Sequence, residues 1–111
     1  MPELVPRRHL GRTNPYEHAD GSRELYVQHC ASCHGESGRG DGPAAGTGWP
    51  PVTDLTRLTA DSLRDDYLFF RVQEGGAFFP YNSTMLPFAG ILNEDDTWRV
   101  ITYVQSLAHG G

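Results

Sequence analysis

The 111-residue chain contains no lysine, so all nine of its permanently positive side chains are arginines. It has 14 acidic residues, which leaves a formal net charge of −5 at pH 7 with neutral histidines. A surface of this sign repels the phosphates of nucleic acids and of anionic lipids. The sequence therefore argues against both as partners and favours a protein partner with a basic docking patch.

The negative charge is unevenly distributed along the chain. Residues 1–19 carry three arginines against two glutamates, a net +1, whereas residues 20–111 carry six arginines against twelve acidic residues, a net −6. The first segment also contains three prolines and no regular apolar period. We expect an extended amino-terminal arm or linker over 1–19 and one compact domain over 20–111.

Long apolar runs are also absent. No stretch of about 18 apolar residues exists, so no membrane span is predicted, and residues 1–6 lack the apolar core of an export signal. Only 38% of the chain is hydrophobic, and it has 13 glycines and 8 prolines. A domain this small with so much loop usually needs a covalent staple or a buried non-protein group to complete its core.

The only two cysteines lie in Cys30-Ala31-Ser32-Cys33-His34, a Cys-x-x-Cys-His motif. Two thiols at this spacing, late in a helix, reach both vinyl groups on one edge of a porphyrin, and the next residue places an imidazole nitrogen beneath the iron. We interpret Cys30 and Cys33 as the attachment site of one haem c and His34 as an axial ligand. A disulfide, a thioredoxin-like pair and half a zinc site are the alternatives. The thioredoxin-like pair needs a βαβ setting and the zinc site needs two more ligands, and neither is evident.

Helical patterns occur in three ranges: 20–29, 59–74 and 93–109. The first runs directly into Cys30, Thr59 is the predicted cap of the second, and Asn93 begins the third. Apolar residues of the third recur at helical spacing, with carboxylates in its first turn at the positive end of the helix dipole. Long loops separate the three ranges and no strand pattern is found. The predicted fold class is therefore all-α.

In its order of parts, the chain from about Gly21 to Leu107 resembles a small bacterial class I cytochrome c. These parts are an amino-terminal helix, the haem motif, a methionine loop and an aromatic carboxy-terminal helix. The resemblance implies the cytochrome c fold, in which three main helices and long loops surround one covalent haem. It also implies that Leu25 and Tyr26 of the first helix pack against Trp98 and Tyr103 of the last.

The resemblance places the second axial ligand on a methionine shortly before the last helix. Apart from Met1, Met85 is the only methionine, and it stands in such a loop. Thioether ligation raises the reduction potential of a haem. The alternative is that Met85 only fills a gap in the core. The family commonly has proline directly after the methionine, whereas in this chain Leu86 precedes Pro87.

The family also supplies a backbone carbonyl, from a proline after the motif, to the second N–H of the axial histidine. Pro43 in Gly40-Asp41-Gly42-Pro43 takes this role by resemblance, and an ordinary Pro-Gly turn is the alternative. The other histidines are rival iron ligands that we expect instead at the surface: His9, His18, His29 and His109.

Two functional hypotheses follow. The favoured one is electron transfer by a His/Met haem, either as a soluble carrier or as the electron-entry domain of a respiratory complex, without enzyme activity of its own. The alternative is a haem enzyme or a gas or redox sensor with an open or displaceable sixth ligand. We expect a monomer in the periplasm or another extracytoplasmic space, because bacterial family members receive their haem there. For the same reason we expect the full precursor to carry an export signal or anchor upstream of residue 1.

Overall fold

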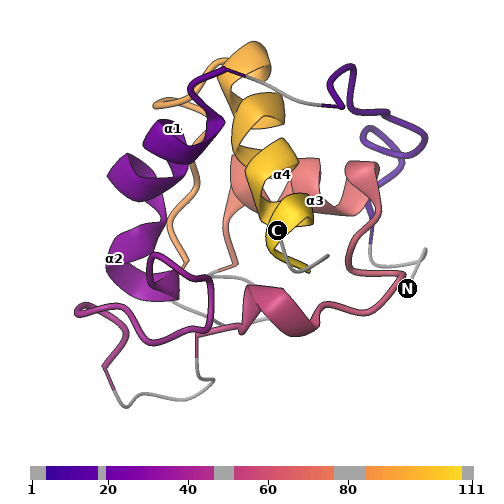
Figure 1. Cartoon of the computed structure of the whole chain (residues 1–111). Helices are drawn as coiled ribbons and strands as arrows, with labels where there is room; N and C mark the ends of the chain where they lie inside the picture. The colour runs from indigo at the N-terminus through magenta and orange to yellow at the C-terminus, as the bar shows by residue number, and fades with distance from the viewer. Residues whose placement is uncertain (1–4, 18–19, 47–51, 77–84, 109–111) are drawn as a thin grey trace.

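The computed structural model describes residues 5–17, 20–46, 52–76 and 85–108. Within these ranges the chain is helical and contains no strand. Its elements are α1 (Ser22–His29), α2 (Ala31–His34), the 3-10 helix η2 (Leu55–Arg57), α3 (Asp65–Glu74) and α4 (Glu94–Ala108), as Figure 1 shows. The prediction of an all-α fold with long loops is confirmed.

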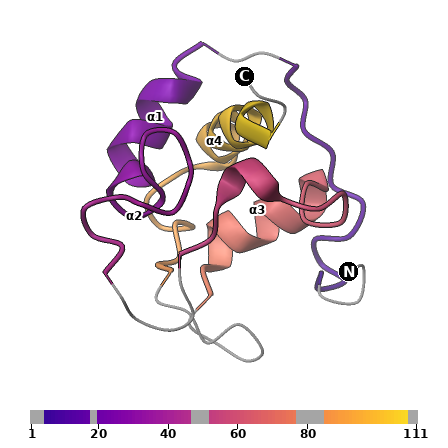
Figure 2. The ribbon, with the colours of Figure 1, turned by 60° about the horizontal axis from the view of Figure 1, so that its bottom comes forward.

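Helix α4 is the central element of the fold. Asn93 caps it as predicted, because its side-chain oxygen accepts a hydrogen bond from the Asp96 amide at 2.8 Å. Figure 2 views α4 nearly along its axis, with α1 on one side and α3 on the other. Its apolar side chains Trp98, Val100 and Ile101 are buried between these helices. Burial of this stripe drives the packing of the domain.

Helix α1 packs on α4 through a pair of tyrosines. The Tyr26 side chain is fully buried, and its ring centroid lies 4.9 Å from that of Tyr103. The Tyr26 hydroxyl donates a 2.6 Å hydrogen bond to the carbonyl of Gly35, directly after the Cys-x-x-Cys-His motif. The predicted pairing of the first and last helices is confirmed, and it also holds the end of the motif against α4.

Helix α3 begins later than predicted. Thr59 caps only a single turn, in which its hydroxyl accepts from the Ser62 amide at 3.3 Å. Arg64 then adopts an extended conformation with ψ 138°, which interrupts the helical path, and α3 starts at Asp65. Its end agrees with the prediction, because Gly75 leaves the helix with a φ of 70°.

Residues 5–17, here called the strap, lie against α3 and α4 (Figure 1). Sequence analysis assigned them to an arm or linker, and they contain neither helix nor strand. Val5 is nonetheless buried, and Asn14 donates hydrogen bonds to Thr102 and Gln105 of α4. The division of the chain at residue 19 stays a prediction.

The expectation of a surface position is wrong for His9. Its exposed fraction is 7%, and its ring packs beside those of Phe69 and Phe70 at centroid distances of 5.7 and 5.8 Å. Its Nε2 atom lies 2.6 Å from a carboxylate oxygen of Glu74. The strap brings His9 onto α3, a contact between residues 65 positions apart that no local pattern indicates.

Asp66 joins the strap to the start of α3. Its carboxylate is buried and accepts hydrogen bonds from the Arg64 guanidinium at 2.6 and 3.0 Å and from the Gly11 amide at 3.1 Å. Burial by itself raises the pKa of Asp66, but the hydrogen bonds from Arg64 and Gly11 outweigh it and lower that pKa overall. The carboxylate is therefore ionised and paired.

Replacing Asp66 by asparagine is expected to destabilise the protein by about 2 kcal/mol at pH 7, since it leaves a partly buried guanidinium without its charged partner. Because folding lowers the pKa of Asp66, its contribution is fully present above about pH 4 and is lost as the pH falls through the folded-state pKa. Urea unfolding of both proteins across this range measures the difference. Glu36→Gln, which loses only an exposed ion pair with Arg23, is the control and should change stability by less than about 0.5 kcal/mol. A difference that grows on acidification would contradict the assignment.

Candidate functional site

The two cysteines lie on either side of a break between α1 and α2. Cys30 ends α1 with a φ of −118°, and Cys33 lies within α2. Both thiols are free and half-buried. Burial, and secondarily the nearby Cys33, raise the pKa of Cys30 to about 12.

This environment is unlike that of a thiol-disulfide exchange pair. A reactive cysteine of such a pair has a lowered pKa, whereas the Cys30 thiol stays protonated at neutral pH. Within the described ranges, no group of three histidine, cysteine or acidic side chains could hold a metal ion. The disulfide, thioredoxin-like and zinc interpretations therefore find no support in these residues.

The orientation of His34 is set by a backbone carbonyl. Its Nδ1 atom lies 3.0 Å from the carbonyl oxygen of Thr53. Because a carbonyl only accepts, Nδ1 carries the proton of the neutral ring, and Nε2 retains a lone pair for a metal. Burial is the main cause that lowers the pKa of His34, the bond to Thr53 opposes it, and the charge of Arg71 lowers the pKa further. The ring is neutral at pH 7, as an iron ligand must be.

The carbonyl that meets His34 comes from Thr53, where the sequence predicted Pro43. The loop after the motif folds back along α2, so the amides of Gly40, Gly42 and Ala44 donate to carbonyls of residues 32–34 at 2.6–2.9 Å. Pro43 therefore lies beside the backbone of the motif. The segment that contains Thr53 passes close to Gly40 and reaches the imidazole of His34. A role of Pro43 in cofactor binding stays a prediction.

Gly42 permits this close return of the loop. A Cβ atom there would lie 2.3 Å from the carbonyl oxygen of Ser32 and 2.5 Å from that of Ala31. Gly40 is equally confined, because its Cβ would lie 2.5 Å from the Val52 oxygen. The glycine-rich composition of residues 35–48 is the sequence signal for this turn, but it does not identify Thr53.

Met85 lies at the carboxyl end of α3. Its carbonyl accepts from the Gly76 amide at 3.1 Å, and its half-buried side chain packs against the hydrophobic core. The amides of Phe88 and Ala89 donate to carbonyls of α3 at 3.0 Å each. The intervening Leu86 is 66% exposed, so the extra residue before Pro87 points to solvent. The assignment of Met85 as an iron ligand stays a prediction.

Arg71 is a charged residue near the site that sequence analysis missed. It lies on α3, donates to the Tyr67 hydroxyl at 2.9 Å and to the Gly75 carbonyl at 3.3 Å, and lowers the pKa of His34. The sequence signal for Arg71 was its position between Phe70 and Val72, two apolar residues of the same predicted helix. The positive charge of Arg71 therefore acts on the imidazole of His34, the predicted proximal ligand.

The other histidines are not brought to this site by any described contact. His29 packs edge-on to Phe88 with ring centroids 5.8 Å apart, and His9 lies on the strap. His18 and His109 lie outside the described residues.

Comparison with known proteins gives a consistent result. The family model described as Cytochrome c matches residues 19–108. A thiosulfate dehydrogenase of Stutzerimonas stutzeri (strain A1501) is 30% identical over 84 residues, which are 76% of this chain and 25% of that protein.

Two solved structures are similar in fold. A chain of the reducing HAO-like protein complex of Kuenenia stuttgartiensis superimposes with a TM-score of 0.66 at 27% identity, covering 86% of this chain and 45% of that one. A c-type cytochrome superimposes with a TM-score of 0.56 at 23% identity, covering 78% and 95% respectively, and its similarity concerns the fold alone. The chain thus spans a quarter of the dehydrogenase and less than half of the matched chain of the HAO-like protein complex.

Replacing Gly42 by alanine is expected to destabilise the protein by about 2 kcal/mol, because the added Cβ meets two backbone oxygens that cannot move independently. Thermal and urea unfolding measure the effect. Gly90→Ala is the matched control, since a Cβ there meets nothing within 4 Å and stability should change by less than about 0.5 kcal/mol. Equal effects of the two substitutions would contradict the packing described.

Proposed function

Because the chain belongs to the cytochrome c family, whose domains bind haem c covalently and transfer electrons through it, we propose that it is a monohaem electron-transfer domain of a larger redox assembly. The observation that carries the proposal is the state of His34. The Thr53 carbonyl orients the neutral imidazole of His34 through Nδ1, which leaves Nε2 available to bind iron. In the sequence, His34 directly follows Cys33, the second of two free thiols. This arrangement is the donor set that haem c requires.

In this proposal Cys30 and Cys33 form the thioether bonds to the haem vinyl groups, and His34 is the proximal ligand. The bound haem supplies an iron that accepts and donates one electron. The residues of the chain hold the ligand geometry constant while the oxidation state changes. The buried Tyr26–Tyr103 contact and the turn at Gly42 serve this purpose, because they keep the motif and Thr53 from shifting relative to each other.

We assign Met85 as the second axial ligand. Its half-buried side chain and the backbone hydrogen bonds of its segment to α3 support the assignment. A thioether ligand would favour the reduced state of a bound haem and would leave its iron without an open position for small molecules. This arrangement suits an electron carrier better than the alternative of a haem enzyme or sensor, which needs an accessible iron site.

The relatives suggest that the domain works beside other redox centres. One is named a thiosulfate dehydrogenase and another is part of a HAO-like protein complex, and both are longer than this chain. We place the chain in an extracytoplasmic redox complex, where it exchanges electrons with a partner that carries a basic patch. In this role it has no substrate site of its own. No helix in the described part of the chain is long and apolar enough to cross a membrane.

Met85→Ala should abolish the weak far-red absorption band that arises between a thioether sulfur and ferric iron. It should also lower the reduction potential and allow the reduced protein to bind carbon monoxide rapidly. Absorption spectra, redox titration and carbon monoxide mixing measure the three effects. Leu86→Ala, at the exposed neighbouring position, should leave all three unchanged. Persistence of the band in Met85→Ala would refute the ligand assignment, and rapid carbon monoxide binding by the parent protein would favour the sensor or enzyme alternative.

The acidic surface should govern the reaction of the haem with charged redox reagents. Reduction of the ferric protein by cationic hexaammineruthenium(II) is expected to slow several-fold as salt shortens the Debye length from about 30 Å at 0.01 M to about 8 Å at 0.15 M. Oxidation by anionic hexacyanoferrate should accelerate over the same range. Stopped-flow rates measure both reactions. Rates that are independent of salt for both reagents would argue against electrostatic docking.

A further inference from the structure

The strap lies outside the residues that the cytochrome c family model matches. The family model begins at residue 19, whereas the strap covers residues 5–17. It is nonetheless integrated into the fold, because Val5 and His9 are buried.

Two consecutive strap residues bind the last residue of α3. Arg8 donates through Nε to Oε2 of Glu74 at 3.1 Å and through Nη2 to Oε1, and His9 Nε2 lies 2.6 Å from Oε2. The hydrogen bond from Arg8 is the main cause that lowers the pKa of Glu74, so this carboxylate is ionised at neutral pH. We call this group, Arg8, His9 and Glu74, the clamp.

Glu74 of the clamp is followed directly by Gly75, whose backbone lies against the Met85 segment. A Cβ at Gly75 would lie 2.5 Å from the Met85 carbonyl oxygen and 2.8 Å from backbone atoms of the next two residues. The Gly76 amide donates to that same oxygen. The end of α3 and the Met85 segment are therefore in direct backbone contact, and a displacement of one requires a displacement of the other.

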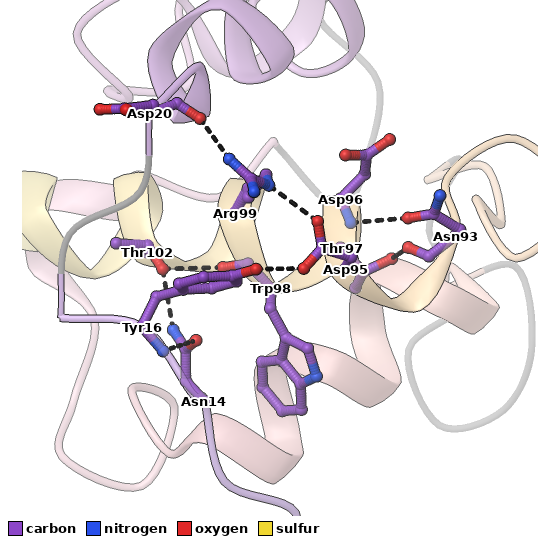
Figure 3. Close-up of polar contacts among 10 residues, drawn as sticks. All are labelled: Asn14, Tyr16, Asp20, Asn93, Asp95, Asp96, Thr97, Trp98, Arg99 and Thr102. Carbon is purple, nitrogen blue, oxygen red and sulfur yellow. Dashed lines mark hydrogen bonds and ion pairs between the residues drawn. The ribbon is translucent and has the colours of Figure 1, made fainter.

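The opposite end of the strap is attached elsewhere, to α4 (Figure 3) and, through the Asn14 amide, to Asp65 at the start of α3. Asn14 donates to Thr102 at 3.0 Å, and the Tyr16 hydroxyl donates to Asp95. The Arg99 guanidinium lies 5.2 Å from the centre of the Tyr16 ring and donates to the Asp20 carbonyl at 2.6 Å. This attachment makes no described contact with Met85, so it provides an internal control for the clamp.

We propose that Glu74, held by Arg8 and His9 of the strap, is a positioning residue that keeps Met85 in place for coordination of the iron. The inference rests on the proposed ligation by Met85. Exogenous ligands bind ferric iron only when the methionine has left it, so their apparent affinity is proportional to the fraction of molecules in that state. Loss of the clamp loosens the end of α3 and increases this fraction.

The test is equilibrium binding of imidazole to the ferric holoprotein, followed through the far-red sulfur-to-iron band. Glu74→Gln keeps the size of the side chain but removes the charge that Arg8 binds. Imidazole should bind about five- to tenfold more tightly to this variant. Arg8→Gln, at a mostly exposed side chain, should act in the same direction and add little in the Glu74→Gln background, as expected for residues of one interaction.

Tyr16→Phe is the matched control, because it removes a strap hydrogen bond at the α4 end. It should change imidazole affinity by less than about twofold even where it lowers the unfolding temperature. The inference is overturned if Glu74→Gln changes affinity by less than about twofold, or if Tyr16→Phe changes it as much. Met85→Ala separates the two claims. If that variant retains the band, the ligation itself is wrong, whereas loss of the band with an inert Glu74→Gln refutes only the clamp.

Discussion

The hydrogen bond between His34 and the Thr53 carbonyl is the contact on which the site depends. It determines which imidazole nitrogen is protonated, which nitrogen is left for a metal, and how the ring is oriented. The bond forms only because the loop after the motif returns along α2 at Gly42 and lets the Thr53 segment cross Gly40. Two glycines without side chains thus determine the chemistry of a histidine several residues away.

The segment that contains Met85 is placed by a similar close approach of backbone to backbone. Gly75 ends α3 and allows the Met85 segment to lie directly against it, and the backbone hydrogen bonds from residues 76, 88 and 89 follow from that contact. His34 is the last residue of a short helix whose carbonyls accept hydrogen bonds from the returning loop, whereas Met85 lies on a segment that is hydrogen-bonded to the end of α3. The packing of α1 and α3 on α4 fixes the position of the His34 segment relative to the Met85 segment, because Tyr26 and Trp98 belong to the same buried core.

Sequence reasoning succeeded where the determining signal is local or periodic. The Asn93 cap, the Gly75 stop and the tyrosine pair of α1 and α4 could be predicted, because each follows from residues adjacent in sequence or from helical spacing. It failed where distant segments meet. The late start of α3 depends on Asp66, which binds both Arg64 and the Gly11 amide of the strap. The burial of His9 depends on Glu74, and the acceptor for His34 is a backbone atom with no side-chain signature.

The uneven distribution of charge along the sequence has a structural role within the molecule. The sequence predicts a basic docking partner from the net negative charge of the chain, and an arm or linker over its net positive first 19 residues. Part of that attraction is satisfied within the molecule, because Arg8 binds Glu74 and Arg12 binds Glu94. The strap therefore occupies carboxylates along α3 and α4 that a basic partner would otherwise contact. Under the proposed function, a basic partner would then dock where acidic side chains remain uncovered. Such a surface would leave the strap in place during electron exchange.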